Sequence, residues 1–361
     1  MPATGVFAQV SPTRYTLNLG TLTGESGSYV VTLLATGAGI RDTDNTLFAT
    51  GISDSWVVST QLTTLLDSAD TAIGDGVSRD VNGASSLRSA VMESNASPGS
   101  DVITLGVGTY LLTRDGRFED SAVFGDLDVR SNVTIRGVDA RSTIIDAGQL
   151  DRMFHVFAGG SLTLENLTIR GGAAFDGGGI FNEGALVVSP QITIPAGIVT
   201  LKNVNVIDNE AYNQGGGIYN AGTLNVTGSS ISRNAAGSRG GAVNNTGTST
   251  YLNTTISTNT AVSRGGGVFN ENSATSNMTN VTIAQNSAGS RGGGLASESP
   301  LGAQIANTLL DGNRTDFRIP VTNASSSANL MGGVLSRGFN LLAILDAKQN
   351  SGTTAGLLTS D

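Results

Sequence analysis

Apolar and polar residues alternate through the first part of this chain. The segments "YTLNLGTL", "SYVVTLLA" and "DSWVVST" within residues 14–58 place apolar residues at every second position, and stretches such as "GESGS" and "DTDN" separate them. This pattern is typical of short antiparallel strands joined by turns. A complete β-sandwich domain takes roughly 100 residues. We therefore expect residues 1–59 to form part of a sandwich, so that the chain begins inside a domain.

A helical pattern then follows a polar stretch. Residues 60–84 are polar and weakly patterned, as in a linker. In the segment "SSLRSAVMESN", Leu87, Ala90 and Val91 recur at helical spacing after serines that can cap a helix. We predict a short helix over 85–96. Because period-two segments begin immediately after it, this helix is expected to cap the open end of a stacked sheet.

From residue 176 onward, one short sequence recurs five times. Its copies read "DGGGIFN", "QGGGIYN", "RGGAVNN", "RGGGVFN" and "RGGGLAS". The apolar residues after the glycines lie 38, 25, 25 and 27 positions apart, and about 13 extra residues around "SPQITIPAG" lengthen the first interval. A register of asparagines has intervals of 25, 25 and 27. These two sets are Ile180, Ile218, Val243, Val268 and Leu295, and Asn209, Asn234, Asn259 and Asn286. Repeated units of this length with β-type segments indicate a solenoid built from strands.

Stacking of such units assigns a role to each repeated residue type. No coil can bury its apolar side chains alone, whereas strands stacked about 4.8 Å apart place equivalent residues in internal columns. Asparagine can form a ladder along one turn, and glycine permits positive φ or close backbone approach. We predict an all-β, right-handed parallel β-helix over 97–345 and a truncated tail over 346–361. One internal column should hold Ile169, Ile231, Ile256 and Ile283.

Composition and charge narrow the classes of function. Glycine contributes 49 of 361 residues, charged residues 14% and hydrophobic residues 39%, which suits a turn-rich protein with a core. A formal net charge of −9 argues against nucleic acid as a partner, because phosphate binding needs a basic surface. The absence of cysteine excludes disulfides and cysteine-ligated zinc. The given residues show neither a signal-peptide pattern nor an apolar run that could span a membrane. We expect a monomer.

Several segments resemble known bacterial families. "SSLRSAVMESN" resembles the N-terminal capping signature of CSLREA-type proteins, and "GGGIFN", "GGGIYN" and "GGAVNN" resemble the repeats of polymorphic outer-membrane proteins. "IANTLLDGN" (305–313) and "SRGFNLL" (336–342) are similar to the closing segments of choice-of-anchor β-helix proteins, and 1–59 resembles part of a bacterial Ig-like domain. The resemblance implies a right-handed parallel β-helix of the pectin-lyase-like superfamily. It also implies a secreted or cell-surface protein, and a superfamily whose enzymes act on polysaccharides.

The residue before each glycine run is the most distinctive candidate for function. Asp176, Gln214 and three arginines occupy equivalent positions, so three guanidinium groups should stack on consecutive coils. Like charges directly opposed in a sheet are destabilising, and a glycine turn does not require arginine. Aromatic residues follow the apolar column at three positions. The predicted binding residues for a polysaccharide or cell-surface glycan are Arg239, Arg264, Arg291, Phe181, Tyr219 and Phe269. The alternative interpretation is that the arginines are solvated and the rings only cover turns.

Catalysis is the second hypothesis. Polar residues cluster on the early coils at Asp126, Asp128, Arg130, Asp139, Arg141, Asp146, Asp151, Arg152 and Asp176. Convergence of several of these Asp residues on one face with an arginine within reach would favour an enzyme, and scattered placement would favour a binding module. The superfamily resemblance implies that such an enzyme would be a lyase, hydrolase or epimerase of uronic-acid glycans, with calcium as a candidate cofactor. The sole histidine, His155, alternates to an outward, solvated position, and lysine occurs only at Lys202 and Lys348. We therefore expect an adhesive or spacer module with no resident cofactor and no turnover.

Overall fold

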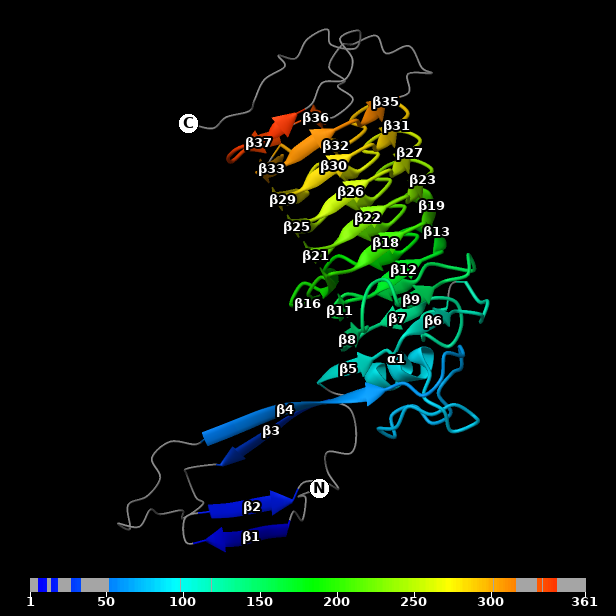
Figure 1. Cartoon of the computed structure of the whole chain (residues 1–361), viewed down its shortest axis with the longest axis vertical. Helices are drawn as coiled ribbons and strands as arrows, with labels where there is room; N and C mark the ends of the chain where they lie inside the picture. The colour runs from blue at the N-terminus through cyan, green and yellow to red at the C-terminus, as the bar shows by residue number, and fades with distance from the viewer. Residues whose placement is uncertain are drawn as a thin grey trace, which may run out of the picture.

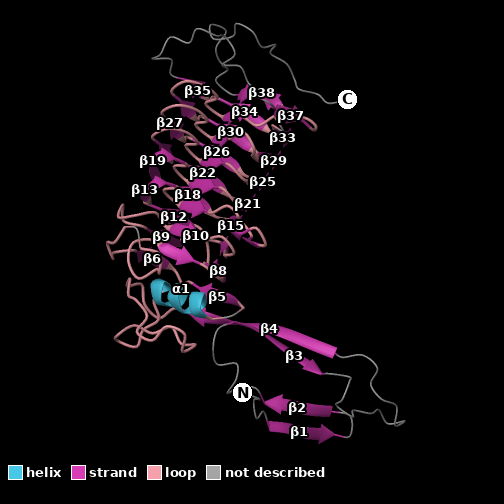
Figure 2. Cartoon of the chain, turned by 180° about the vertical axis from the view of Figure 1, so that it is seen from behind, coloured by secondary structure: helices cyan, strands magenta, loops and turns pink. Residues whose placement is uncertain are grey.

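The computed structural model shows a right-handed parallel β-helix that rises from a helical cap (Figures 1 and 2). It describes residues 6–11, 14–18, 27–33, 52–97, 99–117, 119–300, 302–315, 330–332 and 334–342, with the side chains of the first 59 residues left out. The predicted tail over 346–361 lies outside these residues. The predicted parallel β-helix is confirmed, and four sheets of parallel strands run along its axis.

A coil contributes at most one short strand to each sheet, and sheet 4 begins only at β13. Sheet 1 contains β7 (Leu127–Val129), β10 (Phe154–Val156), β14 (Ile180–Asn182), β20 (Ile218–Asn220), β24 (Val243–Asn245), β28 (Val268–Asn270), β32 (Leu295–Ser297) and β36 (Leu330–Gly332). Sheet 2 contains β5 (Ser100–Thr104), β8 (Asn132–Arg136), β11 (Ser161–Glu165), β17 (Ile198–Lys202), β21 (Thr223–Thr227), β25 (Thr248–Leu252), β29 (Thr275–Thr279), β33 (Ala303–Ala306) and β37 (Val334–Ser336), and it also takes in β3 (Gly27–Leu33) and β4 (Ile52–Gln61).

Two further sheets complete the coil. Sheet 3 contains β6 (Gly108–Leu111), β9 (Thr143–Asp146), β12 (Thr168–Arg170), β18 (Asn205–Ile207), β22 (Ser230–Ser232), β26 (Thr255–Ser257), β30 (Thr282–Ala284), β34 (Leu309–Asp311) and β38 (Leu341–Leu342). Sheet 4 contains β13 (Ala173–Asp176), β19 (Glu210–Gln214), β23 (Ala235–Ala236), β27 (Thr260–Ala261), β31 (Ser287–Ala288) and β35 (Arg314–Thr315). The antiparallel pair β15 (Leu186–Ser189) and β16 (Ile192–Ile194) accounts for the long first interval of the repeat.

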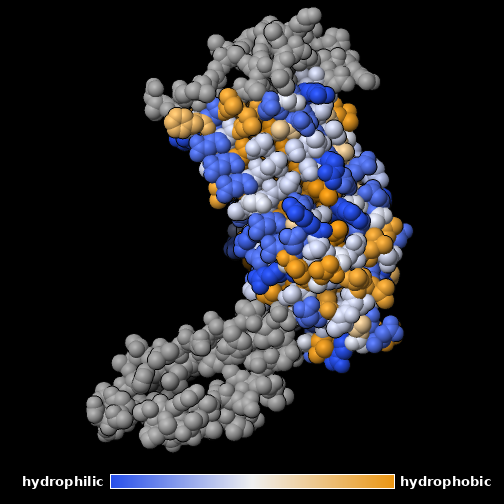
Figure 3. Space-filling view, viewed as in Figure 1, coloured by the Kyte–Doolittle hydropathy of each residue, from blue (hydrophilic) through white to orange (hydrophobic). Residues whose placement is uncertain are grey.

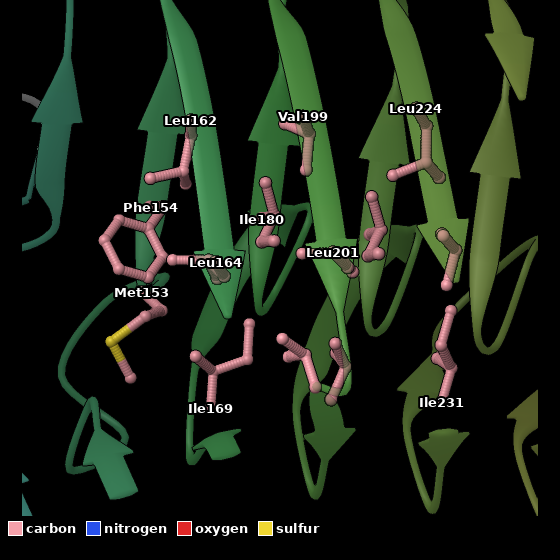
Figure 4. Packing of buried hydrophobic residues seen from close by; sticks show 14 of the residues in the cluster. Met153, Phe154, Leu162, Leu164, Ile169, Ile180, Val199, Leu201, Leu224 and Ile231 are labelled. Atoms are coloured by element: carbon pink, nitrogen blue, oxygen red, sulfur yellow. The ribbon is translucent and has the colours of Figure 1, made fainter. Parts of the chain in front are cut away.

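The core consists of apolar columns, one residue per coil. Leu162, Val199 and Leu224 pair in register on neighbouring strands of sheet 2 and point into the interior (Figure 4). The predicted isoleucine column is confirmed in sheet 3, where Val206 fills the coil between Ile169 and Ile231, and all its members are fully buried. Burying one such side chain contributes about 1.5–3 kcal/mol, so stability accumulates coil by coil.

The repeated glycines are required by the turn into sheet 1. The first glycine of each run has positive φ, for example +68° at Gly215, a conformation that costs other residues energy. The second packs against backbone, since a Cβ on Gly216 would collide with the carbonyl of Ala235 on the next coil. The glycines therefore serve the architecture, as predicted.

The predicted asparagine ladder is also confirmed. Asn209, Asn234, Asn259 and Asn286 are buried, and each Nδ2 donates to the Oδ1 of the next asparagine at 2.9–3.0 Å. Asn313 continues the ladder by one coil. A second buried ladder, which the sequence analysis did not anticipate, joins the last residues of four strands of sheet 1: Asn182, Asn220, Asn245 and Asn270.

The helix α1 (Leu87–Ala96) covers the first coil where a helix was expected, and Figure 2 shows it at the N-terminal end of the coils. Ser86 and Ser89 form a reciprocal capping box at its start. The strands β1 (Val6–Ser11) and β2 (Arg14–Asn18) form an antiparallel pair, and β3 pairs with β4. The end of β4 then pairs in parallel with β5. The Ig-like assignment and the division at residue 59 remain predictions. Within the described part of the chain, no helix is long and apolar enough to cross a membrane.

Candidate functional site

The outer face of sheet 1 carries the residues that the sequence analysis singled out. From β7 to β32, the middle residue of each strand in this sheet points away from the core, and strand pairing aligns these residues along the axis. In order they are Asp128, His155, Phe181, Tyr219, Asn244, Phe269 and Ala296. The glycine turns border this column on one side, and the turns that follow sheet 1 border it on the other. We call the whole surface the sheet 1 face.

The three arginines stack as predicted. Single parallel bridges join Gln214 to Arg239, Arg239 to Arg264, and Arg264 to Arg291. Two of them are not simply solvated, because Arg239 lies 3.8 Å from Glu271 and Arg264 pairs with Glu298 across the face. Arg291 forms no ion pair among the described residues. Burial, followed by repulsion from the two neighbouring arginines, lowers the pKa of Arg264. We call Arg239, Arg264 and Arg291 the arginine column.

The aromatic residues do not form an open binding ladder. Phe181 and Tyr219 stack with ring centroids 4.9 Å apart and an interplanar angle of 5°. The Arg152 guanidinium lies 5.1 Å from the Phe181 centroid. The faces of Phe181 are therefore in contact with groups of the protein itself. Phe269 is fully buried beneath Arg239 and Arg264. The predicted contact of Phe269 with a ligand does not fit this burial, because the two arginines cover the ring.

The early-coil polar residues converge in part. Asp126 pairs with Arg152 at 3.1 Å, and burial, followed by repulsion from Asp128, raises the pKa of Asp126 well above its usual range. Arg130, Asp151 and Asp176 also border the N-terminal half of the sheet 1 face, whereas three members of the predicted cluster lie elsewhere. Asp146 pairs with Arg170 on sheet 3, and Asp139 and Arg141 lie in a turn before β9.

His155 is not solvated, and this expectation was wrong. It does point away from the core, but its side chain is only 13% exposed because neighbouring side chains cover it. The ring stacks on Phe157 at 3.8 Å, and Nε2 lies 3.0 Å from Glu183 Oε1. Burial, followed by the positive charge of Arg152, lowers the pKa of His155 to about 3, so the imidazole is neutral near pH 7. Its Nδ1 lies 3.6 Å from Asp128 Oδ1.

A loop before β7 completes this end of the face. The Asp120 carbonyl accepts hydrogen bonds from Nε and Nη2 of Arg130 at 3.1 and 2.8 Å, and the Ala122 amide donates to Asp128 Oδ2 at 2.7 Å. Asp128 is fully buried, and burial, with the negative charges of Glu119 and Asp120 added, raises its pKa to about 7. Ligand oxygens of Asp120 and Asp128 and a ring nitrogen of His155 lie within 4.8 Å of one another.

The sequence analysis missed four carboxylates of this face: Asp120, Glu183, Glu271 and Glu298. A weak signal was present, because Glu183, Glu271 and Glu298 each follow the last residue of a sheet 1 strand. Intervals of 27 and 26 residues from Asp128 to His155 and from His155 to Phe181 likewise match one coil. Asp120 belongs to a loop without a repeat, so no interval could place it.

Charge is distributed unevenly along the sheet 1 face. Six carboxylates face two arginines at the N-terminal end, whereas three arginines face two glutamates toward the C-terminal end. The first group is Asp120, Asp126, Asp128, Asp151, Asp176 and Glu183 with Arg130 and Arg152; the second is the arginine column with Glu271 and Glu298. Apolar and polar side chains are mixed over the surface seen in Figure 3.

Comparison with known proteins finds similarity at the level of structure. No protein-family model and no curated protein sequence matches the chain. A solved structure, the A-module of mannuronan C-5 epimerase AlgE6 from Azotobacter vinelandii, is similar at 15% sequence identity with a TM-score of 0.30. The match covers 74% of this chain and 97% of that one. At this level of sequence identity, the chemistry of the site has to be argued from the residues of this chain itself.

Proposed function

We propose that this chain is a polysaccharide-binding β-helix of a secreted or cell-surface bacterial protein, in which the arginine column binds an anionic glycan. The observation that carries the proposal is the register of Arg239, Arg264 and Arg291 on consecutive coils. Adjacent strands are about 4.8 Å apart, so the column presents a row of guanidinium groups along the axis. A linear polyanion lying along the β-helix can contact all of them at once.

The glutamates opposite the column do not prevent such binding. Arg239 and Glu271 have side chains 29% and 30% exposed, and a partly exposed ion pair of this kind contributes only about 0–1 kcal/mol. A glycan carboxylate or sulfate can replace Glu271 at little cost and form bidentate hydrogen bonds with the guanidinium group. Because Phe269 is buried and the faces of Phe181 are already in contact, binding relies on charge more than on ring stacking.

The test compares two triple variants with equal changes of charge. Arg239, Arg264 and Arg291 are replaced by alanine in one, and three ion-paired arginines outside the sheet 1 face in the other: Arg136, Arg170 and Arg233. Binding to polymannuronate, polygalacturonate and heparin at low salt should be lost in the first variant only. Equal binding by both variants, or no binding by the native chain, would show that the arginine column has no role in binding and would favour a spacer.

A second function has one observation in its favour. Asp126, Asp128, Arg152 and His155 converge on the sheet 1 face, and Asp126 and Asp128 have raised pKa values, which is typical of enzyme sites. If the chain is an enzyme, we propose that this cluster is its site and that it acts on polysaccharides. Incubation with uronic-acid polymers, followed by absorbance for unsaturated ends and NMR for epimerised residues, tests it. Turnover that Asp128→Asn abolishes would support the enzyme, and no product from any polymer would leave the binding function alone.

A further inference from the structure

Asp128 and His155 face each other, and when the Asp128 carboxyl is ionised no proton donor lies between them. Asp128 is fully buried, and its Oδ1 has no hydrogen-bond partner, although Oδ2 accepts from the Ala122 amide. His155 Nδ1 lies across the gap from Oδ1, at 3.6 Å. A buried carboxylate oxygen without a partner is costly, so either a proton or a bound cation must occupy this gap.

Glu183 determines which ring nitrogen of His155 carries the proton. A neutral imidazole has one N–H, and Nε2 lies 3.0 Å from Glu183 Oε1, an acceptor when ionised. Nε2–H therefore donates to Glu183, and Nδ1 presents a lone pair toward Asp128. Two lone pairs directed at one another attract a cation. A carboxylate that accepts from the distal nitrogen of a histidine is also the usual arrangement behind a metal-bound imidazole.

Asp120 supplies a third ligand at the exposed side of the gap. Its carboxylate lies within 4.8 Å of the other two ligand atoms, and Arg130 holds its backbone in place. The nearby cations are engaged elsewhere, since Arg152 pairs with Asp126, and Arg130 lies over the ring of Phe157. Among the described residues, neither Asp120 nor Asp128 forms an ion pair with arginine or lysine.

We propose that Asp120, Asp128 and His155 bind a divalent transition-metal ion of the Zn²⁺ class. Two ligands of tetrahedral zinc, each about 2.0–2.2 Å from the ion, lie about 3.4 Å apart, close to the 3.6 Å between Nδ1 and Oδ1. One nitrogen and two oxygens suit zinc or its neighbours, whereas calcium prefers oxygen alone. This ligand set differs from the calcium considered for the early-coil carboxylates, and the site is independent of glycan binding by the arginine column.

The single histidine allows a direct test. The full chain without a polyhistidine tag is treated with a chelator and titrated with Zn²⁺ by calorimetry and by ¹⁵N NMR of the imidazole. We expect one ion per chain and a shift of the Nδ1 resonance, and a visible tetrahedral spectrum with Co²⁺. Asp120→Ala changes an exposed residue and should abolish stoichiometric binding without affecting the fold, and Asp128→Asn and His155→Gln should do the same. Glu183→Gln should weaken binding about 10–100-fold by releasing the ring.

Asp146→Asn is the matched control, because Asp146 lies on sheet 3 paired with Arg170. It should bind Zn²⁺ like the native chain. An imidazole spectrum that excess Zn²⁺, Co²⁺ and Mn²⁺ leave unchanged would overturn the proposal and indicate that a proton shared with Asp128 fills the gap. Binding that persists in both Asp120→Ala and His155→Gln would equally overturn it.

Discussion

At the scale of single residues, burial separates repeated side chains that hold the coils together from those that can meet a ligand. Asn259 is fully buried: its Nδ2 donates to the Ile231 carbonyl and to Asn286, and its Oδ1 accepts from Asn234. Arg264 stacks just as regularly but remains partly exposed. The same period of about 25 residues thus serves stability at one position and, by our proposal, recognition at another.

Replacing Asn259 by leucine should destabilise the β-helix by about 2–4 kcal/mol, because buried amides on neighbouring coils lose their partners. The backbone amide and Nδ2 of Asn234 both donate to Asn259 Oδ1. Chemical denaturation measures the loss, with Asn277→Leu as the control, since Asn277 is an exposed strand residue. Equal stabilities for the two variants would show that the ladder contributes nothing.

Asp101 should make stability depend on pH. It is 3% exposed, and burial, with repulsion from Glu93 added, raises its pKa from 3.8 to about 6. Between these values the folded state retains a proton that the unfolded state releases, so stability falls as pH rises and stays lower above pH 6. Asp101→Asn should therefore stabilise the protein by on the order of 1–2 kcal/mol at pH 8 and very little at pH 4. Thermal unfolding across this range checks it, and a gain that is independent of pH would contradict the assignment.

At the scale of elements, the cap determines the shape of the loop that carries Asp120. Arg88 on α1 is fully buried, pairs with Asp67, and donates to the carbonyls of Ala122, Gly125 and Asp126. One arginine thus joins the segment predicted as a linker, the helix and the start of the sheet 1 face. This contact explains why a charged residue stands inside the capping segment.

Arg88→Lys should cost about 3–5 kcal/mol, because lysine cannot reproduce the fork of donors and leaves Asp67 buried without its bidentate partner. Hydrogen exchange should also quicken at the Ala122 amide, which donates to Asp128. Arg141→Lys, in an exposed turn, serves as the control. Unchanged exchange at Ala122 would mean that the loop is held without the cap.

The elements also show what could be read from the sequence. Each coil contacts only its neighbours, so an interval in the sequence becomes a register in space, and the isoleucine column, the asparagine ladder and the arginine column were predictable. Contacts that depend on unrepeated loops were not. The placement of Asp120 beside His155 depends on the path of a loop that has no repeat, whereas Glu298 across from Arg264 had only the weak signal of its place after a sheet 1 strand. For the same reason His155 was expected in solvent, although Glu183 and Phe157 cover it.

At the scale of the whole molecule, charge changes from negative to positive along the sheet 1 face, so the proposed metal site and the arginine column lie in regions of opposite charge. Cations are drawn to the carboxylates on β7 to β14, and an acidic glycan is repelled there and attracted by the arginine column. A bound polyanion should therefore end near Gln214, where the column stops. Exposed charges are screened beyond about 8–10 Å at physiological ionic strength, so affinity should fall steeply with added salt.

Gln214→Arg should lengthen the column from three coils to four and bring a cation beside Asp176. If the column binds polyanions, affinity for polymannuronate or heparin should rise several-fold at low salt, and its dependence on salt should steepen, because one more screened contact is formed. Asn277→Arg adds the same charge at an exposed position of sheet 2 and serves as the control. Glycan-binding isotherms at a series of salt concentrations measure both effects. Equal gains for the two variants would show that net charge alone attracts the glycan; a gain confined to Gln214→Arg would place it along the column.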